Sequence, residues 1–484
     1  MKSITLIIQS VLLPAVIISF SCQQQTKQTS DQPDNYSPLE AYVDTEDSVF
    51  RYEILKTEKL DQHTFHVLKV YSQQWLSDSL VMDPLWWHYI NLVVPDSIKN
   101  DEALMIISGG DREDDVAENG GALLTRAALA SGSITAEIRN VPNQPIRFQS
   151  DTANRMYEDE IIAHGWKMFL ESGAEEKDAE WLARLPMTRS VIKGMDAVTE
   201  FTKSEYGKDI QQFVVAGASK RGWTTWTTAI VDPRVKAIVP IVIDVLNLVP
   251  SMRHHWQAYG KWAPAVQDYE NAGVMEWLNS GEFEQLLDIT EPFNFKNQLT
   301  MPKYIINSAG DQFFQPESWK FYYDQLPGKK MLRYIPNSDH SLRKTDAIQS
   351  LISYYNAIIN EIPLPDYKWT VNDGVTFIKT DPENPPVSVQ LWQAHNPEGR
   401  DFRQEAIGNV WQSSPLEIQE NGNYQVQIDS PAEGWKAYFV ELTYEMPVTP
   451  LKVTTGVVVT PDNYQFAAYQ SKNPQGKMEE EMVP

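Results

Sequence analysis

The sequence has little of three things that assign many chains to a functional class: cysteine, basic charge and long apolar runs. Cys22 is the only cysteine among 484 residues, so no intramolecular disulfide can form. Lysine and arginine number 41 against 65 acidic residues. The net charge of −24 disfavours nucleic acid as a partner, because nothing in the chain would neutralise phosphates. The acidic residues are spread along the chain and mainly favour solubility.

Motifs for cofactors are also absent from the sequence. No phosphate-binding loop of the Gly-x-x-x-x-Gly-Lys type occurs. His254 and His255 are adjacent, so they cannot present two ligands from one helix face to a metal. The acidic residues between positions 111 and 115 could bind a cation, but a solvated loop explains them better. We therefore expect no metal and no cofactor.

The longest apolar run lies at the N-terminus. It follows Lys2 and extends from Ile4 to Phe20, which is short for a membrane span of about 20 residues, and Pro14 interrupts it. Residues 1–22 are therefore expected to be a signal peptide, and the final Ser21-Cys22 loosely resembles the end of a lipoprotein signal, with Cys22 as the lipidated residue. An ordinary signal peptide or an uncleaved anchor is the alternative. Residues 23–39 are polar, and this composition predicts a flexible tether. With the signal peptide before it, the chain is expected to be exported to the cell envelope, where it faces the periplasm or the cell surface. It is expected to contact the membrane only through its lipid.

Apolar runs of strand length alternate with helix-like segments between residues 40 and 362. This alternation predicts a doubly wound, mainly parallel sheet flanked by helices, the α/β class. The expected strands cover residues 65–71, 87–94, 103–107, 133–141, 212–216, 235–243, 303–307 and 330–335, and the expected helices cover residues 121–130, 186–205, 223–231 and 348–359. Two long segments, residues 143–180 and 244–299, fit this alternation poorly. They are expected to form lid insertions over the carboxyl edge of the sheet.

Beyond residue 363 the pattern changes to short alternating runs, separated by Asn, Gly, Pro and Asp, at residues 367–371, 387–392, 424–428, 436–444 and 454–459. Such runs, without helix-length patterns, are typical of a small antiparallel β-sandwich, which we expect over residues 363–470. The last residues, 471–484, are polar and are expected to be frayed. No internal repeat is found.

The segment around Ser219 carries the strongest chemical signal. A strand-like run ends at a Gly-x-Ser-x-x-Gly turn with Gly217 and Gly222, and a helix-like segment follows. A strand-turn-helix elbow of this kind exposes a serine as a nucleophile, whereas the more common pattern has its second glycine where Arg221 stands. The alternative is a helix N-cap, in which the serine hydroxyl bonds a free backbone amide.

Two partners for such a serine follow later strands in the required order. Asp311 follows the strand at 303–307, and His340 follows the strand at 330–335. Both residues are therefore expected at the carboxyl edge of the sheet, with His340 as general base and Asp311 orienting it. The competing interpretations are a plain Gly-Asp turn at Asp311 and a local pairing of His340 with Asp339.

An oxyanion hole requires two backbone amides. We expect one from Lys220, the residue after the nucleophile, and the other from Gly109 and Gly110, although these two glycines could equally form an ordinary turn.

The predicted lids contain two further groups of candidate residues. The acids at 158–160 could bind a substrate amine or simply begin a helix. The tryptophans Trp256, Trp262 and Trp277 could line a pocket or belong to the core.

With these residues identified, the chain resembles the PhoPQ-activated pathogenicity-related protein family, a branch of the α/β-hydrolases, over about residues 40 to 460. The segments that carry the resemblance are Leu85-Trp86-Trp87-His88, Ser108-Gly109-Gly110, Gly217-Ala218-Ser219-Lys220-Arg221-Gly222-Trp223, Asp232-Pro233-Arg234-Val235, Asn307-Ser308-Ala309-Gly310-Asp311-Gln312-Phe313 and Asp339-His340. The resemblance implies a hydrolase fold with Ser219, Asp311 and His340 as triad and an exported or envelope location. It also extends to prolyl-oligopeptidase-like hydrolases, so peptide substrates stay open.

Together these observations predict an envelope-tethered serine hydrolase acting on a small-molecule ester or a peptide. The alternative is a non-catalytic binding or signalling protein that keeps the hydrolase fold. The substrate, the preference for ester or amide, the role of Arg221 and the oligomeric state are not determined by the sequence.

Overall fold

The computed structural model describes residues 36–46 and 48–477 of the chain. The predicted signal peptide with Cys22, and most of the predicted tether, lie outside these residues. None of the helices in the described ranges has the length and apolar character needed to cross a bilayer.

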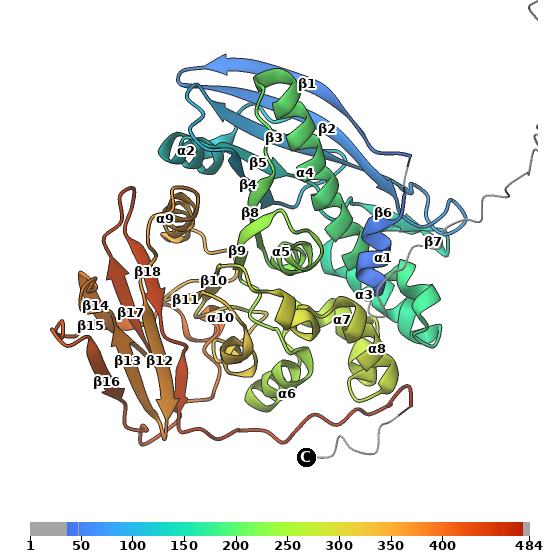
Figure 1. Cartoon of the computed structure of the whole chain (residues 1–484). Helices are drawn as coiled ribbons and strands as arrows, with labels where there is room; N and C mark the ends of the chain where they lie inside the picture. The colour runs from blue at the N-terminus through green and yellow to red at the C-terminus, as the bar shows by residue number, and fades with distance from the viewer. Residues whose placement is uncertain (1–35, 47, 478–484) are drawn as a thin grey trace, which may run out of the picture. The chain divides into compact units, whose positions relative to one another are not determined.

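A nine-stranded sheet forms the centre of the part before the β domain, with the order β1-β2-β3-β5-β4-β8-β9-β10-β11 (Figure 1). Its strands are β1 (Arg51–Leu60), β2 (His63–Gln74), β3 (Leu85–Pro95), β4 (Glu102–Ile107), β5 (Ile134–Ile138), β8 (Gln212–Ala218), β9 (Val235–Ile241), β10 (Lys303–Ser308) and β11 (Lys330–Ile335). Within this sheet, β5, β4, β8, β9, β10 and β11 are parallel to one another, whereas β1, β2 and β3 join through antiparallel ladders. The parallel strands read as continuous apolar runs because both faces of the sheet are covered.

Helices flank both faces of this sheet (Figure 1). The flanking helices are α2 (Gly121–Ser131), α4 (Arg184–Tyr206), α5 (Lys220–Val231) and α9 (Ala347–Ile359). Helix α4 packs against α5, and α2 packs against α9. This alternation of strands and helices around a mainly parallel sheet is the predicted α/β-hydrolase architecture, which is confirmed.

Helix α1 (Pro38–Asp44) begins inside the segment predicted as a tether. The Ser37 hydroxyl accepts from the Glu40 amide, the Glu40 carboxylate accepts from the Ser37 amide, and proline stands in the first turn. This capping box starts the helix, and Leu39 enters the core with 1% of its surface exposed. The expectation that the tether reaches residue 39 is therefore wrong at its end.

The predicted lid segments contain short elements that pack over the carboxyl edge. The first, residues 143–180, contains β6 (Ile146–Phe148), β7 (Asp151–Met156), α3 (Glu158–Glu171) and the start of the 3₁₀ helix η1 (Glu176–Trp181). The second, residues 244–299, contains α6 (Leu248–Tyr259), η2 (Pro264–Val266), α7 (Gln267–Asn271), η3 (Val274–Trp277), α8 (Gly281–Thr290) and η4 (Pro292–Gln298). The loop between β10 and β11 carries η5 (Ser318–Phe321) and η6 (Tyr323–Gln325).

The C-terminal part is an all-antiparallel β domain of two sheets, as predicted. One sheet has the order β12-β13-β16, and the other has the order β15-β14-β17-β18, with β19 also paired to β17. The elements are β12 (Tyr367–Asn372), β13 (Val375–Thr380), β14 (Ser388–Asn396), α10 (Gln404–Ile407), β15 (Gln412–Pro415), β16 (Asn423–Gln427), β17 (Trp435–Tyr444), β18 (Leu451–Thr454) and β19 (Val458–Thr460). Strand β18 contacts β11 of the large sheet, where the Tyr334 amide donates to the Thr454 hydroxyl over 2.9 Å.

The C-terminal strap, residues 461–477, leaves the β domain and runs along the second lid segment (Figure 1). The Phe466 amide donates to the Gln257 carbonyl over 3.1 Å, and the Gln475 amide donates to the Glu276 carbonyl over 3.0 Å. The ring of Tyr469 lies 4.7 Å from that of Trp256. The expectation of a frayed end is therefore wrong for residues 471–477, because backbone groups of the lid form hydrogen bonds with the backbone of this polar segment.

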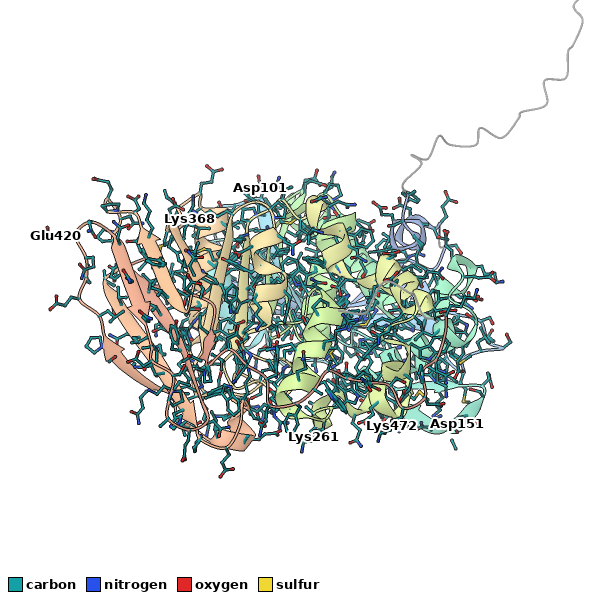
Figure 2. The ribbon with its side chains drawn as sticks, turned by 90° about the horizontal axis from the view of Figure 1, so that it is seen from below. Asp101, Asp151, Lys261, Lys368, Glu420 and Lys472 are labelled. Atoms are coloured by element: carbon teal, nitrogen blue, oxygen red, sulfur yellow. The ribbon has the colours of Figure 1, made fainter. Side chains whose placement is uncertain are left out.

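Many charged side chains lie on the periphery of the molecule. Figure 2 labels six exposed examples that come from all parts of the chain: Asp101, Asp151, Lys261, Lys368, Glu420 and Lys472. This distribution agrees with the interpretation that the acidic balance supports solubility.

Candidate functional site

Ser219 stands between strand β8 and helix α5 with an unusual backbone. Its φ is 59° and its ψ is −127°, a region that non-glycine residues occupy only under strain. Its amide donates to the Ile241 carbonyl of β9 over 2.8 Å, which holds the turn against the sheet. The serine side chain makes no capping hydrogen bond to α5. The N-cap alternative is therefore not supported, and the geometry is that of a nucleophile elbow.

Neighbouring atoms leave no room for a side chain at the two glycines of the elbow. A Cβ at Gly217 would lie 2.5 Å from the Arg221 carbonyl oxygen. A Cβ at Gly222 would lie 2.8 Å from Ile243 Cγ2 and 3.0 Å from the Gly217 carbonyl oxygen. Since the second close contact occurs at position 222, the turn needs its second glycine there and accepts a side chain at position 221.

Arg221 uses this freedom to connect three parts of the site. Its Nε donates to the Val141 carbonyl over 2.5 Å, and its two terminal nitrogens each lie 2.7 Å from a carboxylate oxygen of Glu158 on α3. A Cβ at Gly109 would lie 2.7 Å from Arg221 Nη2. Arg221 therefore supports the Gly109 loop from behind, which is the role that the sequence left open.

The acids at the start of α3 bind cations of the chain itself. Lys220 Nζ lies 2.8 Å from Glu158 and 3.0 Å from Asp159, and Arg221 completes the cluster. Burial opposes the ionisation of Glu158, but the charges of Arg221 and Lys220 outweigh it and lower its pKa to about 2. These contacts give Glu158 and Asp159 partners other than the substrate amine that the sequence left open.

Asp311 and His340 are brought together at the ends of β10 and β11. His340 Nδ1 lies 2.9 and 2.8 Å from the two carboxylate oxygens of Asp311, while the His340 amide donates to the Gln312 side chain over 2.8 Å. Asp311 is buried, and its Oδ1 also accepts from the Phe313 amide over 2.8 Å. The pairing with Asp339 is absent, because that carboxylate bonds Ser341 instead.

A cavity of about 70 Å³ opens beside Ser219. Phe313 and Phe314 line it, and their ring centroids lie 4.3 and 6.0 Å from that of His340. Ser219 and His340 thus flank the same pair of rings, although no hydrogen bond joins the two side chains within residues 36–46 and 48–477. The other lining residues are Asp159, Trp166, Arg184, Lys220, Trp223, Ile243, Val245, Leu248, Met252, Val266, Tyr269, Val274, Met275, Leu278 and Phe283.

The lid tryptophans named from the sequence do not line this cavity. Trp256 and Trp262 pack on each other and on Tyr469 of the C-terminal strap, with ring centroids between 4.7 and 5.0 Å apart. The indoles that do line it are Trp166 and Trp223. No local pattern distinguished these two from the other tryptophans, because a cavity wall is assembled from distant segments.

The Gly109-Gly110 loop approaches the elbow from β4. The Asn140 amide donates to the Gly109 carbonyl over 3.0 Å, and the Gln144 side chain donates to the Gly110 carbonyl over 2.8 Å. In the described part of the chain, neither glycine amide donates a hydrogen bond. The carbonyls are thus held by the protein, while the two N–H groups stay available.

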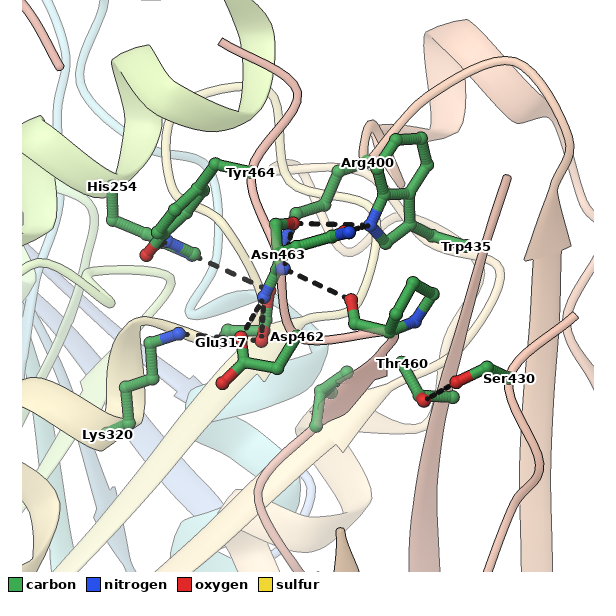
Figure 3. A network of polar contacts seen from close by, with 12 residues as sticks. His254, Glu317, Lys320, Arg400, Ser430, Trp435, Thr460, Asp462, Asn463 and Tyr464 are labelled. Atoms are coloured by element: carbon green, nitrogen blue, oxygen red, sulfur yellow. Dashed lines mark hydrogen bonds and ion pairs between the residues drawn. The ribbon is translucent and has the colours of Figure 1, made fainter. Parts of the chain in front are cut away.

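The β domain supports the loop that carries Asp311. Glu317, six positions after Asp311, accepts from the Arg400 guanidinium through both carboxylate oxygens at 2.8 to 3.0 Å (Figure 3). Both side chains are buried, and Tyr464 of the strap reaches the same cluster by bonding His254 over 2.8 Å. In addition, the Gln404 amide donates to the Gly310 carbonyl over 3.0 Å. The β domain therefore holds the acid loop from outside the sheet.

Over the described ranges, no group of three or more His, Cys, Asp or Glu side chains is arranged to hold a metal ion. In the acidic loop after β4, Asp114 pairs with Arg139 at 2.8 Å and Glu113 pairs with Arg155 at 2.7 Å. These acids therefore form surface ion pairs.

Comparison with known proteins gives one family and one curated relative. The PhoPQ-activated pathogenicity-related protein family matches residues 39–403. The chain is 34% identical over 466 residues to autocrine proliferation repressor protein A of Dictyostelium discoideum, covering 90% of this chain and 93% of that protein.

Among solved structures, the chain is similar to an acetyl xylan esterase from Paenibacillus sp. R4, with a TM-score of 0.45 and 14% identity over 66% of this chain and 92% of the other. It is also similar to acetyl xylan esterase 1 from Thermoanaerobacterium sp. JW/SL YS485, with a TM-score of 0.41 and 11% identity over 67% and 93% of the two chains.

Proposed function

The chain belongs to the PhoPQ-activated pathogenicity-related protein family, and we propose that it is a serine hydrolase whose catalytic triad is Ser219, His340 and Asp311. One observation carries the proposal: the strained backbone at Ser219 places this serine at the wall of a cavity, and its side chain makes no capping hydrogen bond to helix α5. Strain of this kind persists where the surrounding structure maintains it, and it is concentrated at functional sites. The pairing of the buried Asp311 with His340 beside the same cavity supports the assignment.

In the proposed reaction His340 removes the proton of the Ser219 hydroxyl as the oxygen attacks the carbonyl carbon of the substrate. Asp311 bonds His340 Nδ1, which orients the ring, leaves Nε2 as the base and stabilises the imidazolium. His340 then donates the proton to the leaving alcohol or amine, and a water molecule repeats the sequence to release the acid. Hydrogen bonds between nucleophile and base often tighten only when substrate binds, so the open contact between Ser219 and His340 is compatible with this role.

The oxyanion of the tetrahedral intermediate is assigned to the amide of Lys220 and to those of Gly109 and Gly110. Lys220 begins helix α5, so its N–H has no partner within the helix. The arginine behind Gly109 keeps this loop close to the elbow. Substrates are small-molecule esters or peptides, since both pass through the same kind of intermediate.

Location at the envelope is part of the same proposal. It rests on the apolar N-terminal run that ends at Cys22, which is the residue proposed to carry the lipid. Metabolic labelling with a radioactive fatty acid should label the wild-type chain and leave Cys22→Ala unlabelled. Label in both proteins would remove Cys22 from this role.

A fluorophosphonate probe tests the catalytic assignment. Wild-type protein should be labelled, Ser219→Ala should not be, and Asp311→Asn should react much more slowly because its imidazole loses the orienting charge. Ser204→Ala is the matched control, since Ser204 is an exposed serine on α4 outside the proposed triad, and it should be labelled like the wild type. A folded wild-type protein that neither reacts with the probe nor hydrolyses a panel of short esters and aminoacyl amides would contradict the proposal.

A second candidate is a binding or signalling protein without catalysis. The name of the curated relative, a proliferation repressor, favours it, because that protein covers most of this chain at 34% identity. In this case Ser219→Ala would retain the biological activity of the wild type. Loss of that activity in Ser219→Ala with unchanged folding would exclude it.

A further inference from the structure

Arg184 is a buried arginine in the wall of the cavity beside Ser219. It stands at the first position of helix α4, only 4% of its surface is exposed, and the mechanism above does not use it. Its Nη1 donates to the Lys220 carbonyl over 3.0 Å, and its Cζ lies 4.5 Å from the ring centroid of Trp223. The guanidinium is therefore held one peptide away from the proposed nucleophile.

Unlike the neighbouring cations Lys220 and Arg221, Arg184 has no carboxylate partner among the described residues that balances its charge. Lys220 and Arg221 each have a carboxylate partner on α3 within 3.0 Å. Arg184 forms no ion pair with a carboxylate in the described ranges, and its Nε has no hydrogen-bond partner there. Burial lowers the pKa of this guanidinium, while Tyr269 and Asp159 act in the opposite direction. A buried cation without a paired anion is costly, and a ligand can supply that anion.

We propose that Arg184 binds a carboxylate of the substrate, so that the hydrolase acts on esters or amides whose acyl group carries a free carboxylate on an apolar body. The remaining wall fits the apolar body, since it includes Met252, Met275 and Phe283. A carboxylate fits better than a phosphate dianion, because Asp159 also lines the cavity and would repel the additional charge. Arginine is suited to this task because its planar guanidinium matches the geometry of a carboxylate.

This inference rests on the proposed function, and a purely structural role of Arg184 is its main competitor. By holding the Lys220 carbonyl, Arg184 could simply position the peptide that contributes to the oxyanion hole. A positioning role would lower kcat for every substrate to a similar extent. Recognition of a carboxylate lowers kcat/KM only for substrates that carry one. The ratio of the two kinds of substrate therefore separates the roles.

The experiment compares monomethyl glutarate with methyl pentanoate, which has the same carbon chain but no charge. Monomethyl succinate and monomethyl adipate cover shorter and longer reaches, and Ser219→Ala provides the background rate. Hydrogen bonds to charged groups contribute enough to predict that wild-type kcat/KM is about 10- to 100-fold higher for the best charged ester than for its neutral counterpart. Arg184→Gln should reduce this preference to about 1.

Arg189→Gln is the matched control, because Arg189 is equally buried on the same helix but bonds the backbone carbonyls of Tyr42 and Thr45 instead. It should keep the wild-type preference for the charged ester. Calorimetric binding of monomethyl glutarate to Ser219→Ala, lost in the double variant with Arg184→Gln, gives a readout that does not require turnover. Equal hydrolysis of charged and neutral esters by the wild type overturns the inference while leaving the hydrolase intact. Absence of any Ser219-dependent hydrolysis overturns the proposed function instead.

Discussion

The backbone strain at Ser219 makes a quantitative prediction that does not depend on knowing the substrate. Ser219→Ala removes the hydroxyl but keeps a Cβ at φ 59° and ψ −127°, whereas Ser219→Gly removes both the hydroxyl and the strain. Such strain costs about 1 to 3 kcal/mol, and the additional freedom of glycine in the unfolded chain offsets about 0.5 to 1 kcal/mol of the relief. We therefore expect Ser219→Gly to be more stable than Ser219→Ala by about 0.5 to 2 kcal/mol.

Urea unfolding followed by tryptophan fluorescence measures this difference between two proteins that both lack the proposed nucleophile. Ser204, exposed within helix α4, is the control position, because glycine is unfavourable in a regular helix. There the order should reverse, with Ser204→Gly less stable than Ser204→Ala by about 0.5 to 1 kcal/mol. If glycine were the less stable substitution at both positions, the reasoning about the elbow would be refuted.

Two further predictions concern the ion pairs around the site. Burial opposes the ionisation of Glu158, but the charges of Arg221 and Lys220 outweigh it and lower the pKa of this carboxyl group from 4.5 to about 2. The stability that the ionised Glu158 contributes is therefore fully present above pH 4.5 and is lost as the pH falls towards 2. Because the Glu158 side chain is 38% exposed, solvent screening leaves about 1 kcal/mol of this effect, and urea titrations at about pH 6 and about pH 3 should find it reduced in Arg221→Met. An identical pH profile in that variant would contradict the pairing. Arg400→Met leaves the buried Glu317 carboxylate without its main partner, and we expect a loss of about 3 kcal/mol in stability together with slower ester hydrolysis, because the acid loop is released. Adding Glu317→Gln should recover part of that stability, and no recovery in the double variant would exclude this explanation.

The sequence predicted the parallel part of the sheet well, because those strands are buried on both faces. The runs at 212–216, 303–307 and 330–335 correspond to strands β8, β10 and β11. Strand β1 (Arg51–Leu60) was missed, since it is an edge strand with charged residues at alternating and adjacent positions and has no buried apolar face. Edge strands commonly carry such charges, which prevent pairing between molecules, and this hides them from a search for apolar alternation.

In the β domain the same search found β12, β14, β16 and β17 and missed β13 and β15. The runs at 424–428 and 436–444 correspond to β16 and β17. Strand β15 (Gln412–Pro415) has four exposed residues, so it has no apolar pattern to detect. The single strand expected over residues 454–459 is instead divided into β18 and β19, which both pair with β17. Only the pairing partner defines such short segments.

By itself the amino-acid sequence determined that the proposed triad residues Ser219, Asp311 and His340 would lie at one edge of the sheet, because each follows a strand and parallel strands end at one edge. The tertiary structure alone decided what surrounds them. Arg184 and Arg221 lie 37 positions apart in the sequence, yet one lines the cavity and the other supports the Gly109 loop. The physical reason is that strand order follows from local periodicity, whereas the pairing of buried charges depends on contacts between distant segments that no local pattern encodes.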